Sequence, residues 1–209
     1  MSIGRPTPRA GVFAERRYRQ GLESWRRKWR DGAEGERKTE KALRPLEKAG
    51  WTVVHDVEAR YGNYDHIAVG PAGVYLFETK NLQGIVDIRS GAPHLTRRHD
   101  PDACVVFQKY RPRALGAAAD IKKCIQERSG HSTWVQAVVV FWAEFPEGLV
   151  EDGLCVYIHG SRLKDWLAEH QTRLDGGQVE NIAAVIERLD DERAVDNGEA
   201  RLMHRAVSA

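Results

Sequence analysis

Cysteine is scarce in this sequence: the 209 residues include three cysteines, which are widely spaced and form no Cys-x-x-Cys pair. That pattern argues against a disulfide framework and against a cysteine-based zinc site. Histidine gives no metal signature either, because the histidines at positions 55, 66, 94, 99 and 131 never fall at His-x-x-x-His spacing. We therefore expect most of them to be surface residues or hydrogen-bonded core residues.

Long apolar runs are also missing. No stretch reaches the roughly 18–20 apolar residues that a membrane span requires, and the arginine-rich N-terminal segment has no apolar signal-peptide core. The sequence therefore predicts a cytoplasmic protein with no membrane partner. It also lacks the glycine-rich junction of a nucleotide cradle and the Gly-x-Ser-x-Gly motif of a serine nucleophile.

Net charge is small, at +2, so whole-chain electrostatics say little about a polyanionic partner. A hydrophobic content of 42% in 209 residues supports one good core rather than two. We expect one main domain over residues 32–190, a basic segment over residues 1–31 and a polar tail over residues 191–209.

The basic segment has two interpretations. Trp25 and Trp29 are four residues apart, as on one helical face, which favours a helix docked on the core. The alternative is an arm that follows nucleic-acid phosphates through Arg26, Arg27 and Lys28. We rank docking first.

The most informative feature is a pair of apolar segments, residues 63–70 and 73–80, joined through a Pro-Ala-Gly turn. The fixed φ of proline and the tolerance of glycine for positive φ predict an antiparallel hairpin. In the register that this turn sets, Asp65 lies opposite Glu78, with Cβ atoms roughly 4.5–5.5 Å apart. Lys80 is two residues further along and shares the face of Glu78.

Two carboxylates that close repel each other, so at neutral pH one takes up a proton or both share a cation. A hard cation such as Mg²⁺ prefers a few carboxylate oxygens and keeps several waters. We expect Asp65 and Glu78 to hold Mg²⁺ or Mn²⁺, and Lys80 to hold a water. The alternative is that all three are solvated strand ends, but the apolar run before Glu78 is typical of a buried strand and argues against it.

These residues carry a resemblance. Asp65 followed by Glu78-Thr79-Lys80 resembles the signature of the PD-(D/E)XK nuclease superfamily, with Tyr64 where its name expects proline. Four local segments resemble its nuclease-related domain (NERD) branch, namely residues 32–36, 62–66, 73–75 and 78–84. The likeness runs from about residue 32 to residue 84.

The resemblance implies a restriction-endonuclease-like fold and a metal-dependent nuclease that acts on DNA rather than RNA. It implies that Asp65 and Glu78 are catalytic metal ligands and that the Thr79 carbonyl is a third ligand. Lys80 would position or activate water. It also makes Glu36 an accessory catalytic residue, although a helix dipole alone favours an acid in a first turn. Gln108 matches the glutamine that opens a helix in the family and is an accessory candidate.

Hydrophobic periodicity predicts helices at residues 35–49, 103–128 and 179–189, and strands at residues 51–57, 134–141 and 154–158. Residues 84–88 are expected to extend the hairpin's sheet. Residues 91–101 read as a loop that exposes Arg97 and Arg98 as nucleic-acid contacts, and Pro112 is expected to kink or split the middle helix. This order predicts an α/β sandwich around a central mixed β-sheet flanked by helices.

The sequence therefore favours a Mg²⁺- or Mn²⁺-dependent phosphodiester hydrolase. The rival from another class is a non-catalytic nucleic-acid-binding module with a vestigial nuclease site. A third interpretation is a protein-binding role for the arginine-rich arm.

Overall fold

A mixed β-sheet forms the core of the computed structural model, which describes residues 29–59 and 62–189. Its six strands lie in the order β1-β2-β3-β7-β9-β8. They are β1 (Thr52–Ala59), β2 (Gly62–Gly70), β3 (Gly73–Lys80), β7 (Val135–Phe141), β8 (Leu149–Asp152) and β9 (Cys155–His159). Strands β3, β7 and β9 pair in parallel, whereas β1, β2 and β8 join antiparallel to their neighbours.

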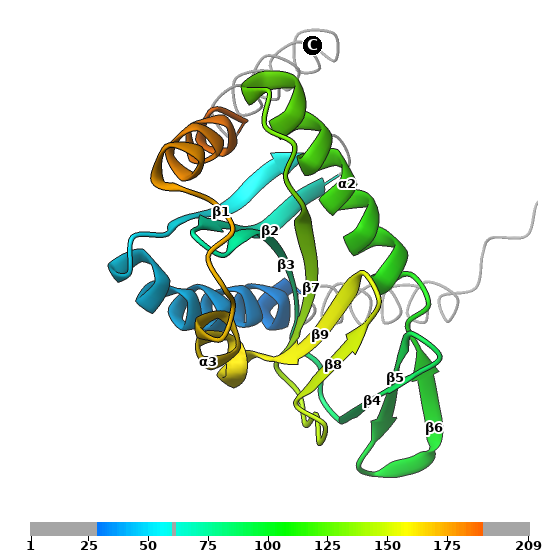
Figure 1. The fold of residues 1–209 in the computed structure, drawn as a ribbon. Helices are drawn as coiled ribbons and strands as arrows, with labels where there is room; N and C mark the ends of the chain where they lie inside the picture. Colours follow the sequence, from blue (N-terminus) through cyan, green and yellow to red (C-terminus); the bar gives the residue numbers. More distant parts are fainter. Residues whose placement is uncertain (1–28, 60–61, 190–209) are drawn as a thin grey trace, which may run out of the picture.

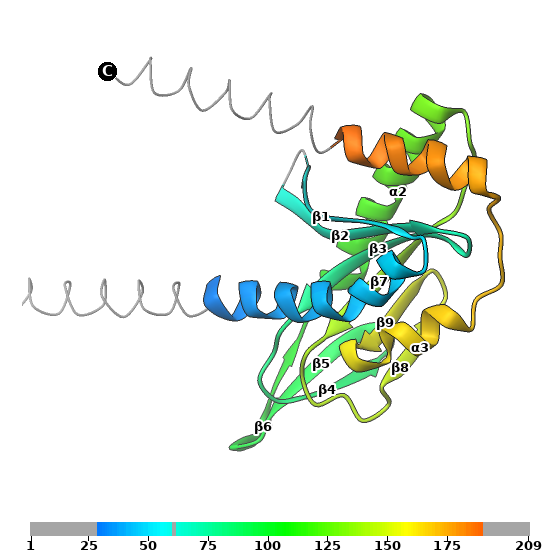
Figure 2. The ribbon, with the colours of Figure 1, turned by 90° about the vertical axis from the view of Figure 1, so that its left-hand side faces the viewer.

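Helices cover both faces of this sheet (Figures 1 and 2). Helix α2 (Tyr110–Ser129) and a C-terminal helix over residues 176–189 pack on one face. An N-terminal helix that includes residues 29–48 packs on the other, next to α3 (Leu163–Ala168), which follows the short 3-10 helix η1 (Gly160–Arg162). The expected restriction-endonuclease-like α/β sandwich is confirmed. None of the described helices is long and apolar enough to cross a membrane.

The central strands are apolar on both sides because both faces of the sheet are covered. In β7, Ala137 and Val139 face α2, while Val138 and Val140 face the N-terminal helix and α3, and all are buried. Strands of parallel sheets covered by helices have such continuous apolar runs. This packing fixes β3 in the middle of the molecule, so the residues at its carboxyl end have a rigid support.

The β2–β3 hairpin has the register that the sequence predicts. Gly70 pairs with Gly73 and His66 with Phe77, and two residues separate the strands. Gly73 has a φ of 131°, which a side chain would strain. The even loop therefore brings Asp65 and Glu78 to facing positions at the open end of the hairpin.

The largest error of the sequence prediction concerns the segment between β3 and α2. Residues 84–88 do not extend the main sheet, and residues 91–101 are not a loop. They form a separate three-stranded sheet of β4 (Ile85–Arg89), β5 (Ala92–Arg97) and β6 (Asp100–Val106). We call this the small sheet. It lies beyond the end of the main sheet at which β3 ends (Figure 1).

The helix expected from residue 103 begins only at Tyr110, because β6 continues to Val106. Helix α2 is one element, and Pro112 is its third residue rather than a break. At that position a missing N–H costs nothing, since the first N–H groups of a helix have no intrahelical partner. Strand β8 was not predicted at all.

The closing helix predicted at residues 179–189 is confirmed; it begins at residue 176 and buries Ile182, Val185, Ile186 and Leu189. The first helix was predicted to begin too late, because residue 29 is already helical. Trp29 is 66% exposed, and Trp25 lies outside the described residues, so the docking of this segment on the core remains a prediction. The other residues of the proposed arm and the tail at 191–209 lie outside the described residues, so the boundaries 1–31, 32–190 and 191–209 remain predictions.

Candidate active site

Asp65 and Thr79 link the two strands of the hairpin at its open end. The ladder between β2 and β3 ends at the pair His66 and Phe77, so Asp65 and Glu78 occupy the next facing positions. There the backbone N–H of Thr79 donates a 2.6 Å hydrogen bond to Oδ2 of Asp65. Asp65 is also one of the residues that line the neighbouring cleft.

Lys80 contacts both an acid and an aromatic ring. Its Nζ lies 2.9 Å from Oε2 of Glu78, and the two side chains are 23% and 21% exposed. The same ammonium group lies 5.4 Å from the ring centroid of Tyr110, the first residue of α2. A cation over a ring face at this distance is attracted by the ring quadrupole. The lysine is therefore held from two sides.

Burial and crowding of negative charge shift the titration of Asp65. Burial, followed by repulsion from Glu78, raises the pKa of Asp65 to about 7, against the opposing effects of Lys80 and the Thr79 hydrogen bond. At neutral pH this carboxyl is thus part protonated in the absence of a cation. A perturbed acid inside a cleft is typical of functional sites.

The pKa of Lys80 is shifted upward, which keeps this side chain charged. Burial alone favours the neutral amine, yet Glu78 and Asp65 raise the pKa of Lys80 above its ordinary value. Lys80 is therefore an ammonium group at neutral pH. In this state it donates hydrogen bonds and cannot accept a proton.

Glu36 reaches the same site from the N-terminal helix. Burial, followed by repulsion from Asp56, raises the pKa of Glu36, and Glu78 acts in the same direction. Glu36 also lines the same cleft as Asp65 and Lys80. The structure therefore brings together all four acidic and basic residues that the sequence analysis named as catalytic.

The predicted metal ligands fit a hard cation. Within residues 29–59 and 62–189, no group of three or more His, Cys, Asp and Glu side chains is arranged to hold a metal ion. The predicted set requires only two, Asp65 and Glu78, together with the Thr79 carbonyl. In a strand, the N–H and C=O of one residue point to the same side, so the Thr79 carbonyl faces the side on which its N–H meets Asp65. Mg²⁺ is commonly held by one or two carboxylates and several waters.

A cleft of about 1190 Å³ opens over this site. It is larger than the roughly 300–1,000 Å³ of ordinary small-molecule pockets. The N-terminal helix, the end of β3 and the small sheet line it. Arg97 and Arg98 are exposed as predicted and lie at its edge, and Arg98 pairs with Glu144.

Gln108 is not brought to the cleft. It is exposed in the turn before α2, whereas Phe107 and Tyr110 on either side of it line the cleft. Arg26, Arg27 and Lys28 lie outside the described residues. Their roles remain predictions.

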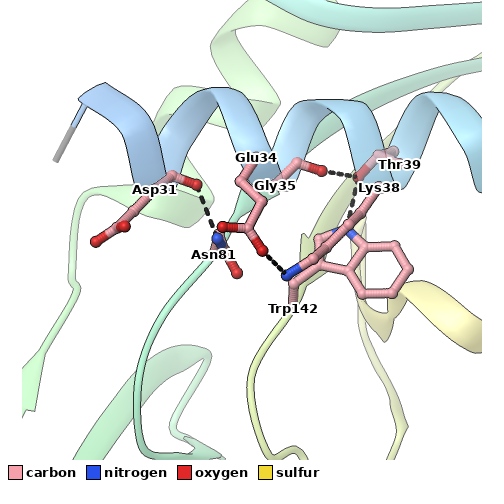
Figure 3. Close-up of polar contacts among 7 residues, drawn as sticks. All are labelled: Asp31, Glu34, Gly35, Lys38, Thr39, Asn81 and Trp142. Carbon is pink, nitrogen blue, oxygen red and sulfur yellow. Dashed lines mark hydrogen bonds and ion pairs between the residues drawn. The ribbon is translucent and has the colours of Figure 1, made fainter. Parts of the chain in front are cut away.

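A buried hydroxyl group, that of Thr39, fixes the N-terminal helix against β3, and Figure 3 shows its bonds to Gly35 and Trp142. Thr39 Oγ1 accepts hydrogen bonds from Thr79 Oγ1 at 2.9 Å and from Trp142 Nε1 at 2.8 Å, and donates to the Gly35 carbonyl at 3.3 Å. A hydroxyl has one donor and two acceptor positions, so all three are used. The helix that carries Glu36 is thus hydrogen-bonded to the strand that carries Glu78 and Lys80.

The helix and strand touch closely at Gly35. A Cβ atom there would lie 2.7 Å from Asn81 Cβ and 3.1 Å from Thr79 Cγ2. One turn earlier, the carbonyl of Asp31 accepts a 2.8 Å hydrogen bond from the Asn81 side chain (Figure 3). Glycine is therefore required at position 35 by close approach of the backbone.

The comparison with known families agrees with this geometry. A family model described as nuclease-related domain matches residues 31–142, which is more than half of the 209 residues. The chain belongs to the nuclease-related domain family. No curated protein and no solved structure matches the chain.

The matched part of this nuclease-related domain begins and ends at residues of the site. Asp31 is bonded to Asn81, and Trp142 is bonded to Thr39. Glu36 and the whole β2–β3 hairpin lie inside the match, as does the small sheet. Two strands of the main sheet, β8 and β9, lie outside the match. So do α3 and the C-terminal helix, which pack on the sheet.

Sequence reasoning missed Thr39, Trp142 and Tyr110. Thr39 gave a usable signal, because it lies four residues after Gly35 and four before Leu43, on the buried stripe of the helix. A polar residue in such a stripe requires a partner. Trp142 and Tyr110 gave no comparable local signal, since their partners are distant in sequence.

Asp56 was also missed. The β1–β2 ladder skips Asp56 and Asp65 between its regular pairs, and Asp56 has a φ of 54°. The Asn63 side chain donates a 2.6 Å hydrogen bond to its carboxylate. Positive φ at a non-glycine residue costs energy and is often found at functional sites. The nuclease-related domain thus has an irregular strand beside its acid pair.

Proposed function

We propose that this nuclease-related domain hydrolyses phosphodiester bonds of nucleic acid, DNA in preference to RNA, with Mg²⁺ or Mn²⁺ as the cofactor. The observation that supports this most directly is the convergence of Asp65, Glu78 and Lys80 at one end of a hairpin, where Asp65 and Lys80 line a large cleft. The choice of DNA rests on likeness to the superfamily, because no described residue distinguishes the two sugars.

Asp65 and Glu78 would hold the cation through carboxylate oxygens, and Thr79 through its carbonyl. When bound, such an ion offsets charge on phosphoryl oxygens and lowers the pKa of a bound water. Asp65 meets the requirement for rigid placement, since the Thr79 N–H fixes one of its oxygens at 2.6 Å. Its raised pKa means that a cation must displace a proton, so binding weakens as pH falls below about 7.

Lys80 acts first as a hydrogen-bond donor. Its ammonium group can contact a phosphoryl oxygen or the attacking water, which positions the water for in-line attack. It becomes able to accept a proton only when the charges of Glu78 and Asp65 are compensated, because those charges hold its pKa up. Glu36, whose pKa is also raised, is suited to hold a second water or to exchange a proton with it.

The test is cleavage of supercoiled plasmid and labelled oligonucleotides in Mg²⁺, in Mn²⁺ and in EDTA. Wild type is expected to cut only with the metals. Asp65→Asn and Glu78→Gln are expected to be inactive, and Lys80→Met is expected to cut much more slowly. Glu36→Gln should reduce the rate. Its matched control is Glu34→Gln on the same helix, since Glu34 pairs with Lys38 on the surface.

A specific observation supports a second candidate, a nucleic-acid-binding module without catalysis. Lys80 and Glu78 form an ion pair at 2.9 Å, so a cation must compete with the lysine for this acid. If the pair persisted, nucleic acid would bind without being cut. Metal-independent binding combined with no cleavage of any DNA or RNA by wild type would favour this candidate.

A further inference from the structure

The two walls of the cleft differ in character. The N-terminal helix contributes the polar wall, with Asp31 and Glu36. The small sheet and the segment after it contribute an apolar wall that contains Leu95, Val105 and Phe107. The cleft is also lined by Arg97, the last residue of β5, and by Arg98 and His99 in the turn between β5 and β6. A ligand in the cleft therefore meets acidic side chains on one side, and an apolar surface bordered by basic side chains on the other.

An aromatic pair continues the apolar wall toward the catalytic lysine. The rings of Phe107 and Tyr110 stack with centroids 4.6 Å apart and planes 8° apart. Tyr110 in turn lies under the Lys80 ammonium group. The apolar wall thus reaches directly to the position proposed for phosphodiester cleavage.

The small sheet is held firmly in place. Glu144 bridges it to the main body, because its carbonyl accepts from the Val86 N–H at 2.8 Å and its N–H donates to the Gly84 carbonyl at 3.1 Å. At the β4–β5 turn, the Tyr157 hydroxyl donates a 2.7 Å hydrogen bond to the Gly91 carbonyl. The wall is therefore preorganised rather than formed by the ligand.

A double helix is a poor match for such a wall. Its outer surface offers phosphates and sugars, and its bases are already stacked on one another. Unpaired bases expose flat apolar faces, which stack on aromatic side chains while basic residues follow the phosphates. Apolar and aromatic side chains that line one cleft with two arginines match the second description.

We propose that the cleft selects single-stranded nucleic acid, with bases against Val105 and Phe107 and phosphates near Arg97 and Arg98. This inference rests on the proposed function for its location, but its test measures binding alone. The small sheet is then the element that determines substrate class.

The structure offers a matched pair of variants. Val105 and Val106 are neighbours on β6 and are 41% and 42% exposed, yet only Val105 lines the cleft. Val105→Asp and Val106→Asp change net charge equally. Only Val105→Asp is expected to weaken binding of single strands, by about tenfold or more, because it places a charge against stacked bases. Phe107→Leu, which keeps the apolar volume, should weaken binding about fivefold or more.

The probes are fluorescein-labelled oligothymidylate, its duplex with oligoadenylate, and an abasic strand of the same length. Fluorescence anisotropy in EDTA measures binding without cleavage, and thermal melting checks that each variant is folded. Wild type should bind oligothymidylate more tightly than the duplex and more tightly than the abasic strand. Equal affinity for the abasic strand would mean that only phosphates are contacted, which overturns the proposal.

Failure of this inference is distinguishable from failure of the proposed function. If wild type cuts nothing but shows the expected preference and the Val105 effect, the inference stands and the nuclease proposal falls. If it cuts duplex and single strands equally well, and the two valine variants bind alike, the nuclease proposal stands and the inference is wrong.

Discussion

Asp65 accepts its hydrogen bond from the backbone of Thr79, the residue between Glu78 and Lys80, at 2.6 Å. The carboxylate on one strand is thus positioned by the main chain of the strand that carries the other two groups. A main-chain donor cannot rotate away as a side chain can. Geometry between the two strands is therefore tightly fixed even without a cation, and the predictions below depend on it.

The first prediction concerns pH and stability in EDTA. The folded protein binds a proton at Asp65 with a pKa of about 7, against an ordinary value of 3.8. Between these values the folded state holds more protons than the unfolded state, so stability falls as pH rises from about 4 to 7. At about 1.4 kcal/mol per pKa unit, the loss is at most about 4 kcal/mol.

Asp65→Asn isolates this effect, since its amide oxygen can still accept from Thr79 but does not titrate. Urea unfolding of both proteins across this pH range is the measurement. The wild-type free energy of unfolding should fall relative to that of the variant as pH rises. If the two free-energy curves ran parallel across this pH range, ionisation of Asp65 would not destabilise the folded protein.

The second prediction separates metal binding from chemistry at Lys80. Lys80→Met frees Glu78 from its ion pair, so Mn²⁺ affinity should stay the same or become tighter. The cleavage rate should fall about 100-fold or more, as expected for loss of a group that assists proton transfer. Glu78→Gln should lower both the Mn²⁺ affinity and the cleavage rate. Mn²⁺ titration calorimetry and cleavage rates give the two readouts.

Lys122→Met is the matched control for this experiment. Lys122 also lies over an aromatic ring, 5.6 Å from the centroid of Trp134, but its helix position is far from the cleft lining. It should change neither readout. A Lys80→Met protein that cuts at the wild-type rate at saturating metal would rule out the role given to this lysine.

The third prediction tests the hydroxyl of Thr39. Thr39→Val keeps the shape but removes a group with three hydrogen-bond partners, which leaves Trp142 Nε1 without its acceptor. Such a change costs about 1–3 kcal/mol. Thr39→Ser keeps the hydroxyl and should cost less, about 1 kcal/mol for one buried methyl group. Urea unfolding ranks the two, and a larger loss in the serine variant would contradict the hydrogen-bond account.

The fourth prediction compares two glycines of one helix. Alanine stabilises a helix interior over glycine by about 0.8–1.0 kcal/mol. Gly32→Ala should show such a gain, because nothing lies within 4 Å of its Cβ position. Gly35→Ala should lose stability and cleavage rate instead, since its Cβ would lie 2.7 Å from Asn81 Cβ and push the helix that carries Glu36 away. Similar melting temperatures for the two variants would mean that the contact is not tight.

The β2–β3 hairpin could be predicted because its information is local. A proline and a glycine define the turn, and period-two alternation then assigns every facing pair, including Asp65 with Glu78. The same reasoning identified the last helix from four buried residues at helical spacing. Local signals therefore sufficed for the fold class and for three of the four catalytic candidates.

The small sheet could not be predicted from local signals. Its strands are short, and Pro93 and Pro101 interrupt their pattern, so residues 91–101 looked like a loop. These strands are stabilised by contacts distant in sequence, such as Tyr157 with Gly91 and Glu144 with Val86. Tertiary contacts of this kind override weak strand propensity.

The bond between Thr39 and Trp142 also has a consequence for protein synthesis. It spans 103 positions of the chain, whereas the hairpin that carries Asp65, Glu78 and Lys80 closes over a two-residue turn. Nearby contacts form early, and distant pairings such as β3 with β7 form late. A ribosome-bound chain therefore exposes the complete acid–lysine group before the residues that bury β3 and anchor Thr39 have been made. During synthesis, Asp65, Glu78 and Lys80 are therefore present before β7 and Trp142, which hold their strand in place.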